Sequence, residues 1–238
     1  MKPSMLMFQD LDEASRAAAE TIAEEVERRT PCSLVLSGGS TPRRLFDLLS
    51  TEWRTRLPWS RIHLFWSDER FVPPHDAASN FGMAAELFID HVPVPAANVH
   101  RVPTERPSAS AAADAYEDEV RGYFAETGSE GFDLALLGVG TDGHTASLFP
   151  GRSTNPDRWV EAVVGPEHRP PRDRITMTYR ALSAVRRVHF LAGGPEKRAV
   201  LSQIAAGADL PAGRVMGTDE TLFLLDRAAA PVEAHGTP

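Results

Sequence analysis

The sequence predicts an α/β fold of three layers, in which helices cover both faces of an open, mostly parallel sheet of the Rossmann-like kind. Short apolar segments of strand length alternate along the chain with longer segments in which apolar residues recur at helical spacing. Several of the apolar segments run directly into glycine-rich or charged loops. This alternation is typical of strands that pair in parallel through helical crossovers. At 238 residues, the chain is long enough for one large domain of this kind.

The first strand–loop–helix unit lies near the N-terminus. Residues 13–29 are rich in alanine and carry charges at helical spacing, which predicts a surface helix that ends before Pro31. Residues 33–36 are expected to form a short buried strand that continues into Ser-Gly-Gly-Ser-Thr at residues 37–41. Pro42 occupies a position that the first turn of a helix tolerates, and the apolar residues after it predict an amphipathic helix.

The same pattern recurs through the rest of the chain. Residues 61–66 predict a strand that ends at Ser-Asp-Glu-Arg, residues 67–70, and a helix is expected from about residue 79 to residue 90. The other expected helices cover residues 108–126 and 195–206, and the other expected strands cover residues 132–137, 159–164, 174–178, 187–192 and 221–225. We expect residues 1–227 to form a single domain and residues 228–238 to form a flexible C-terminal tail.

Four unusual loops fall at the ends of expected strands, at residues 37–41, 67–70, 138–144 and 193–197. In open parallel sheets, ligands bind beyond the carboxyl ends of the strands, near the point where the strand order reverses. We therefore expect the four loops to share one rim of the sheet and to form a binding site there.

Composition and charge argue against several classes of function. The net charge of −8 disfavours a nucleic-acid-binding protein with a broad basic face, because such binding neutralises many phosphates. No apolar segment approaches the ~20 residues of a membrane span, and the N-terminus has no signal-peptide core. The histidines follow no metal-binding spacing such as H-E-x-x-H and there is no cysteine cluster, so no metal site is expected. The single cysteine, Cys32, is expected to be a buried thiol, which is typical of a cytoplasmic protein.

Gly138, Gly140 and Gly143 are spaced as G-x-G-x-x-G after an expected strand. This spacing occurs in dinucleotide-binding loops, where a full helix follows the third glycine and the pyrophosphate lies at its N-terminus. Here a Pro-Gly pair at residues 150–151 interrupts any such helix, and Asp142 places a negative charge where the pyrophosphate would lie. Dinucleotide binding is therefore disfavoured.

Asp142 and His144 flank Gly143 in the same loop. A carboxylate that holds an imidazole fixes its tautomer and favours its protonated form, which makes the histidine a general base near neutral pH. The alternative is a capping aspartate beside a histidine that serves only the structure. The residues alone leave both interpretations open.

The other three loops carry groups that suit an anion. Residues 37–42 offer backbone N–H groups and hydroxyls at a helix N-terminus, although a tight turn with ordinary capping has the same pattern. Arg70 could stabilise an anion while Asp68 or Glu69 holds it in place, or the three could form a structural salt-bridge cluster. Lys197, in the first turn of an expected helix, opposes the helix dipole unless an anion lies nearby.

Five stretches, in order along the chain, resemble the 6-phosphogluconolactonase family. They are "LSGGSTPRRLFDLL", "FWSDERFVPPHDAASNFGMA", "FDLALLGVGTDGHTASLFPG", "RITMTYRAL" and "FLAGGPEKRAVL". The resemblance covers the chain from about Leu34 to Leu225, and this family shares its fold with the glucosamine-6-phosphate deaminases and isomerases. It implies hydrolysis of 6-phospho-D-glucono-1,5-lactone to 6-phosphogluconate, in the oxidative branch of the pentose phosphate pathway, without a metal or an organic cofactor.

The Asp-Gly-His sequence beside a cationic rim leads to a hypothesis for the mechanism of this reaction. His144 would deprotonate the attacking water while Asp142 orients its ring. Arg70 and the backbone amides around Gly38 and Gly39 would stabilise the tetrahedral oxyanion.

Further residues of the same loops, together with nearby cations, are expected to bind the substrate. They are Ser40, Thr41, Asp68, Gly143, Arg152, Arg174 and Lys197. The 6-phosphate would be held by Arg152, Arg174 and Lys197. The expected partner is the small phosphorylated sugar lactone, bound by a monomer or a weak homodimer that contacts neither nucleic acid nor membrane.

Two alternative functions accompany this expectation. The first is glucosamine-6-phosphate deaminase or isomerase activity. The deaminase pattern reads D-G-H-I-A-F-N-E-P, with a glutamate five residues after the histidine that assists ring opening, and in this chain that position is Phe149. The deaminase loop at residues 68–70 usually reads D-E-Y, whereas this chain has Arg70. The second alternative is a non-catalytic sugar-phosphate sensor of the same fold, a class that normally carries a DNA-binding segment.

Overall fold

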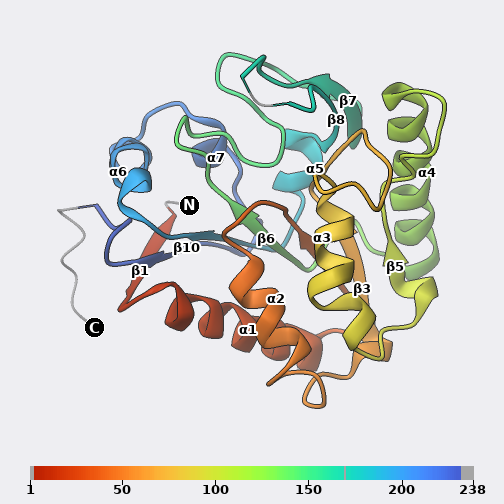
Figure 1. The fold of residues 1–238 in the computed structure, drawn as a ribbon, viewed down its shortest axis with the longest axis horizontal. Coiled ribbons are helices and arrows are strands. Elements are labelled where there is room, and N and C mark those ends of the chain that lie inside the picture. Colours follow the sequence, from red (N-terminus) through yellow and green to blue (C-terminus); the bar gives the residue numbers. More distant parts are fainter. Residues whose placement is uncertain (1–2, 169, 232–238) are drawn as a thin grey trace.

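A parallel sheet of seven strands runs through the middle of the molecule (Figure 1). The computed structural model describes residues 3–168 and 170–231. The strands lie in the order β1 (Ser4–Phe8), β10 (Glu220–Asp226), β9 (Arg187–Ala192), β6 (Leu134–Gly138), β2 (Cys32–Leu36), β3 (Ile62–Trp66) and β5 (Val99–His100). Every neighbouring pair is parallel. The expected open parallel sheet is confirmed.

Helices lie on both sides of this sheet, with α1 and α2 on one side and α5 and α7 on the other (Figure 1). The α-helices are α1 (Leu11–Arg28), α2 (Arg43–Ser50), α3 (Asn80–Leu87), α4 (Ala109–Thr127), α5 (Tyr179–Ser183), α6 (Arg198–Ala205) and α7 (Pro211–Arg214). Short 3-10 helices are η1 (Trp59–Arg61), η2 (Ile89–His91), η3 (Ala96–Asn98) and η4 (Pro195–Lys197). None of the helices in the described ranges has both the length and the apolar character needed to cross a membrane.

A second sheet of three antiparallel strands lies above the parallel sheet in the view of Figure 1. Its strands are β4 (Asp68–Arg70), β8 (Asp173–Met177) and β7 (Val160–Val164), in that order. The strands expected at residues 159–164 and 174–178 are both present, but they belong to this separate sheet. Residues 67–70 are expected to be a loop, and this expectation is corrected for the last three residues, because they pair with β8.

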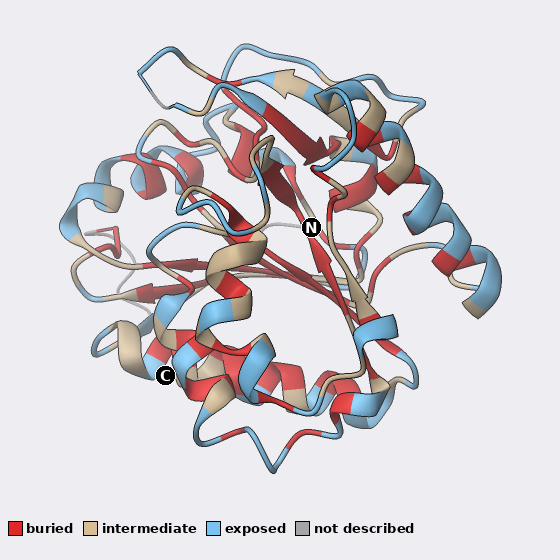
Figure 2. Ribbon diagram, turned by 45° about the vertical axis from the view of Figure 1, so that its right-hand side comes forward, coloured by how far each residue is buried: buried red, intermediate tan, exposed pale blue. Residues whose placement is uncertain are grey.

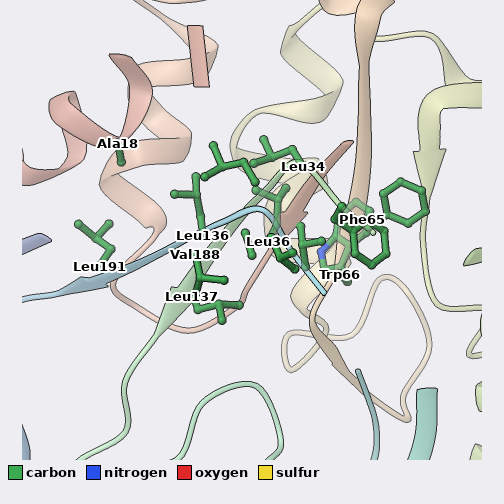
Figure 3. Close-up of a cluster of buried hydrophobic side chains, with 14 of the residues drawn as sticks. Ala18, Leu34, Leu36, Phe65, Trp66, Leu136, Leu137, Val188 and Leu191 are labelled. Atoms are coloured by element: carbon green, nitrogen blue, oxygen red, sulfur yellow. The ribbon is translucent and has the colours of Figure 1, made fainter. Parts of the chain in front are cut away.

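The hydrophobic core fills the space between the parallel sheet and its helices (Figure 2). All five residues of β2 are buried, as a central strand with cover on both faces requires. Figure 3 shows Leu34, Phe65, Leu136 and Val188, from four neighbouring strands, in one cluster of buried side chains. Burying one such side chain contributes about 1.5–3 kcal/mol. Cys32 is buried as expected, and its burial raises the pKa of the thiol.

The order of the strands reverses between β2 and β6. From β2 the chain proceeds to β3 and β5 at one edge, and from β6 it proceeds to β9 and β10 toward the other. Because the strands are parallel, the loops that follow β9, β6, β2 and β3 emerge side by side along one rim. The topology therefore places the four expected loops next to one another.

The packed chain extends beyond the expected domain end at residue 227. Ala229 and Ala230 are buried, and the backbone N–H groups of both donate to the carbonyl of Asp226 at the end of β10. The expectation of a flexible tail from residue 228 is corrected for these residues, because they pack against the core. Residues 232–238 lie outside the described residues.

Candidate active site

A polar cavity of about 200 Å³ lies where the loops after β2, β3, β6 and β9 meet. Most of the expected site residues line it, and they are Gly38, Gly39, Ser40, Thr41, Asp68, Arg70, His144, Arg174 and Lys197. The cavity adjoins a larger groove of about 940 Å³, with which it shares Gly39, Ser40 and Arg70. The glycine loop and Arg70 therefore form the boundary between the two spaces.

The glycine loop, residues 37–41, connects β2 to α2. Gly38 packs against Asn80 so closely that a Cβ at Gly38 would lie 1.7 Å from Asn80 Oδ1. Gly39 has a φ of +92°, which a residue with a side chain rarely adopts. Pro42 provides no side-chain cap for α2. Uncapped backbone N–H groups at the start of a helix favour a nearby anion, as the sequence predicts.

The His144 loop, residues 139–149, follows β6. The carboxylate of Asp142 accepts hydrogen bonds from the Nδ1–H and, at 3.3 Å, from the backbone N–H of His144. The imidazole lies against Gly140, where a Cβ would come within 1.9 Å of Nδ1. The expected Asp–His pair is therefore present, and the bond at Nδ1 fixes the tautomer of the ring.

Phe149 packs beside the imidazole of His144. The two ring centroids are 5.3 Å apart, and the rings are tilted by 35°. The guanidinium carbons of Arg152 and Arg174 lie 5.8 and 6.0 Å from the centroid of the Phe149 ring. An apolar ring thus stands at the position where the resemblance places the glutamate of a deaminase.

Strands β4 and β8 place two arginines directly opposite each other. Arg70 pairs with Arg174 in the antiparallel register, and both line the cavity. Nη1 of Arg70 donates to the carbonyl of Ala78 at 2.8 Å, and its buried Nε has no hydrogen-bond partner within the described chain. Facing like charges repel, so this pairing favours an anion beside the two guanidinium groups.

The carboxylates of Asp68 and Glu69 are both buried. Glu69 accepts hydrogen bonds of 2.7 Å from the backbone N–H groups of Arg70, Asn80 and Phe81. Burial raises the pKa of Glu69, although these N–H groups oppose the rise. Glu69 therefore holds the backbone of Arg70 and the start of α3 in place. The carbonyl of Ala78 accepts a hydrogen bond from the guanidinium of Arg70.

Three expected residues do not line the cavity. Asp142 lies behind His144 and accepts a hydrogen bond from the imidazole, which lines the cavity. Gly143 has a φ of +85° and lies against Leu210. The expected place of Arg152 in the phosphate site is not supported, because its guanidinium donates to the carbonyl of Val164 and borders a separate cavity.

Three residues that are neither expected at the site nor part of the four expected loops lie at or beside the cavity. Asn80 and Ala146 line it, and Ser147 follows in the His144 loop. Ala146 has a φ of +48°, the left-handed conformation that a residue with a side chain adopts at a cost. All three lie within stretches that carry the family resemblance, but the sequence indicates no role for them, because Asn80 and Ser147 bond Asp68 from segments distant in the sequence.

In chemical terms, the cavity combines a histidine oriented by a carboxylate with three cations, Arg70, Arg174 and Lys197. Such a set can activate water and stabilise negative charge on a substrate. Within residues 3–168 and 170–231, no group of three histidine, cysteine or acidic side chains is arranged to hold a metal ion.

Known proteins resemble the chain over most of its length. The profile of the family described as "Glucosamine-6-phosphate isomerases/6-phosphogluconolactonase" matches residues 9–224. A 6-phosphogluconolactonase of Nostoc sp. is 39% identical over 203 residues, which cover 83% of this chain and 82% of that protein. A 6-phosphogluconolactonase of Thermotoga maritima is 36% identical over 215 residues, which cover 90% of this chain and 92% of that protein.

Solved structures share the arrangement of layers. The crystal structure of 6-phosphogluconolactonase from Thermotoga maritima superposes with a TM-score of 0.85 at 33% identity, covering 95% of this chain and 100% of the other. A monomeric glucosamine-6-phosphate deaminase superposes with a TM-score of 0.78 at 22% identity, covering 95% of this chain and 98% of the other. The second likeness shows a shared fold alone.

Proposed function

Because the chain belongs to the family of glucosamine-6-phosphate isomerases and 6-phosphogluconolactonases, we propose that it hydrolyses 6-phospho-D-glucono-1,5-lactone to 6-phosphogluconate. This reaction belongs to the oxidative branch of the pentose phosphate pathway. The observation that carries the proposal is that His144, oriented by Asp142, lines the same cavity as Arg70, Arg174 and Lys197.

In the proposed mechanism, a water molecule attacks the carbonyl carbon C1 of the lactone. His144 takes a proton from this water through Nε2, while Asp142 holds Nδ1 and stabilises the imidazolium that forms. The carbonyl oxygen becomes an oxyanion, which Arg70 and the backbone N–H groups around Gly38 and Gly39 stabilise. The bond between C1 and the ring oxygen then breaks, and the imidazolium returns its proton to that oxygen. The enzyme ends in its starting protonation state.

The 6-phosphate is assigned to Arg174 and Lys197, which line the cavity from β8 and η4. The hydroxyls of Ser40 and Thr41 border the same space and can donate to phosphate oxygens. No metal or organic cofactor enters the proposal. A cytoplasmic location and a monomeric or weakly dimeric state are proposed with it, the former in keeping with the buried free cysteine.

Phe149 favours a lactonase over a deaminase. Opening a sugar ring and moving a proton at C2 requires an additional acid–base group near the histidine, and lactone hydrolysis does not. The Phe149 ring, which is buried and packs against His144, cannot accept or donate a proton. A hydrolytic reaction therefore suits this cavity better than isomerisation with loss of ammonia.

The test is turnover of freshly prepared lactone, measured against its spontaneous hydrolysis, beside a parallel assay with glucosamine 6-phosphate. We expect lactone hydrolysis well above the spontaneous rate and no release of ammonia. Ammonia release with no lactone turnover would assign the chain to the deaminases instead. Binding of 6-phosphogluconate with neither turnover would identify a sugar-phosphate sensor.

A further inference from the structure

The His144 loop is attached to the three-stranded sheet through Ser147. The hydroxyl of Ser147 donates to Oδ2 of Asp68 at 2.6 Å, and its backbone N–H donates to the hydroxyl of Thr176 at 3.2 Å. Asp68 and Thr176 face each other across β4 and β8. Ser147 is three residues beyond His144, so these two bonds hold the end of the loop that carries the base.

The same carboxylate bonds Asn80, which packs against the glycine loop. The amide of Asn80 donates to Oδ1 of Asp68 at 3.2 Å and to its backbone carbonyl at 2.9 Å. The other end of this amide, Oδ1, packs against Gly38, where no Cβ would fit, and makes no hydrogen bond within the described chain. One side chain therefore joins Asp68 to the loop whose N–H groups are proposed to receive the oxyanion.

We infer that the Asp68 carboxylate is a positioning group, which sets the separation of the His144 loop from the glycine loop through Ser147 and Asn80. The inference rests on the proposed function, since it explains how the general base and the oxyanion donors keep their relative places. It differs from the sequence-based expectation that Asp68 binds the substrate. One of its oxygens accepts from Ser147 of the His144 loop, and the other accepts from Asn80, the first residue of α3, which packs against Gly38 of the glycine loop.

The hydrogen bonds of Asp68 with Ser147 and Asn80 are buried. Asp68 is 6% exposed, and Ser147 and Asn80 are each 2% exposed. A buried carboxylate that loses a donor is not resolvated by bulk water, so the surrounding chain must shift to satisfy it. We expect the His144 loop to make this shift, because Ser147 belongs to it and its residue Ala146 already has a φ of +48°, a left-handed conformation.

The test compares Ser147→Ala with Thr145→Val. Both variants remove a buried hydroxyl from the same loop, but the hydroxyl of Thr145 makes no hydrogen bond within the described chain. We expect Ser147→Ala to lower kcat by about 10²-fold, as a misplacement of about 1 Å does, with KM within about threefold of the wild type. Thr145→Val should keep a kcat close to that of the wild type.

A double-mutant cycle separates the shared bond from independent effects. If Asp68 and Ser147 act through one hydrogen bond, Asp68→Asn and Ser147→Ala together should reduce kcat by less than the product of the single losses. Multiplicative losses would contradict the inference. A wild-type kcat for Ser147→Ala, measured on fully folded protein, or an equal loss in Thr145→Val, would overturn it as well.

A crystal structure of Ser147→Ala gives a readout that does not depend on activity. The distance between the Cα atoms of Gly38 and His144 should change by about 0.5 Å or more relative to the wild type. An unchanged distance would remove Asp68 from this role. If the wild type shows no lactone turnover, the proposed function fails, and the crystallographic comparison still decides the positioning role.

Discussion

Arg70 and Arg174 face each other across the antiparallel strands β4 and β8, at the wall of a cavity of about 200 Å³. Directly opposed like charges in a sheet destabilise the folded state. A fold that keeps two guanidinium groups in this arrangement is therefore expected to gain stability when an anion binds beside them.

6-Phosphogluconate should raise the melting temperature of the protein by binding beside Arg70 and Arg174. At a concentration of 100 times Kd, binding stabilises the folded state by about 2.7 kcal/mol, which corresponds to about 5–10 °C for a chain of this size. Arg70→Ala and Arg174→Ala should each lose most of this shift in differential scanning calorimetry. Arg28→Ala removes an exposed arginine of α1 and serves as the control, with the full shift retained. Equal shifts in all three variants would exclude the arginine pair from anion binding.

Replacing the proposed base should affect turnover far more than binding. His144→Ala is expected to lower kcat by about 10²–10⁴-fold with a smaller effect on KM, because only proton transfer is lost. Steady-state lactone hydrolysis, corrected for the spontaneous rate, measures both constants. His91→Ala, which alters an exposed histidine that contacts the carbonyl of Glu86, should behave like the wild type. A kcat close to the wild-type value in His144→Ala would rule out this base.

Lys197 should distinguish phosphorylated from unphosphorylated lactones. If its ammonium group binds the 6-phosphate, Lys197→Ala raises KM for the phosphorylated substrate and leaves KM for gluconolactone nearly unchanged. The comparison is made by measuring kcat/KM for both lactones with the wild type and the variant. A proportional loss with both substrates would show that Lys197 acts elsewhere in the cavity.

Stability should decrease as the pH falls below about 6.5, because of His189. Nε2 of His189 donates to Glu220 at 2.8 Å, and its buried Nδ1 has no hydrogen-bond partner within the described residues. Burial lowers the pKa of His189 below its ordinary value of 6.5. The unfolded chain therefore binds more protons than the folded one below that pH. The stability that the neutral ring provides above it is lost at up to about 1.4 kcal/mol per pH unit.

Urea denaturation of the wild type and of His189→Gln, at about pH 7.5 and about pH 5.5, checks this expectation. Glutamine can still donate to Glu220 but does not titrate, so its midpoint should depend less on pH. Burial lowers the pKa of His63 as well, which leaves the variant with part of the dependence. Identical pH dependence in both proteins would assign the effect to other groups.

The rim of the site was predictable because its signals are local. Apolar segments followed by glycine or charged loops identify the ends of β2, β3, β6 and β9 from a few consecutive residues each. Parallel pairing then places those ends together without any knowledge of side-chain contacts. The pairing of Asp142 with His144 was also predictable from the sequence, because only Gly143 separates the two residues.

The remaining features depend on contacts between distant segments. β1 (Ser4–Phe8) is a partly exposed edge strand, and its short Met-Leu-Met-Phe run does not indicate that it pairs with β10, more than 200 residues further along the chain. β4 contains three polar residues and is a strand only because β8 lies beside it. Nothing near Ser147 in the sequence indicates that its hydroxyl meets Asp68, and nothing near Arg152 indicates that its guanidinium turns toward Val164.

We expect the pairing of β2 with β6 to form later in folding than the local helices. The backbone N–H and the hydroxyl of Ser33 both donate to Asp133 at 2.8 Å, across 100 residues of chain. Closing so long a loop is slow and entropically costly, and neighbouring hairpins or helices cannot complete it on their own. The general base and the oxyanion donors follow these two strands, so a nascent chain that has not yet emerged as far as β6 holds only half of the machinery. Recovery of activity during refolding should therefore lag behind helix formation and coincide with closure of the middle of the sheet.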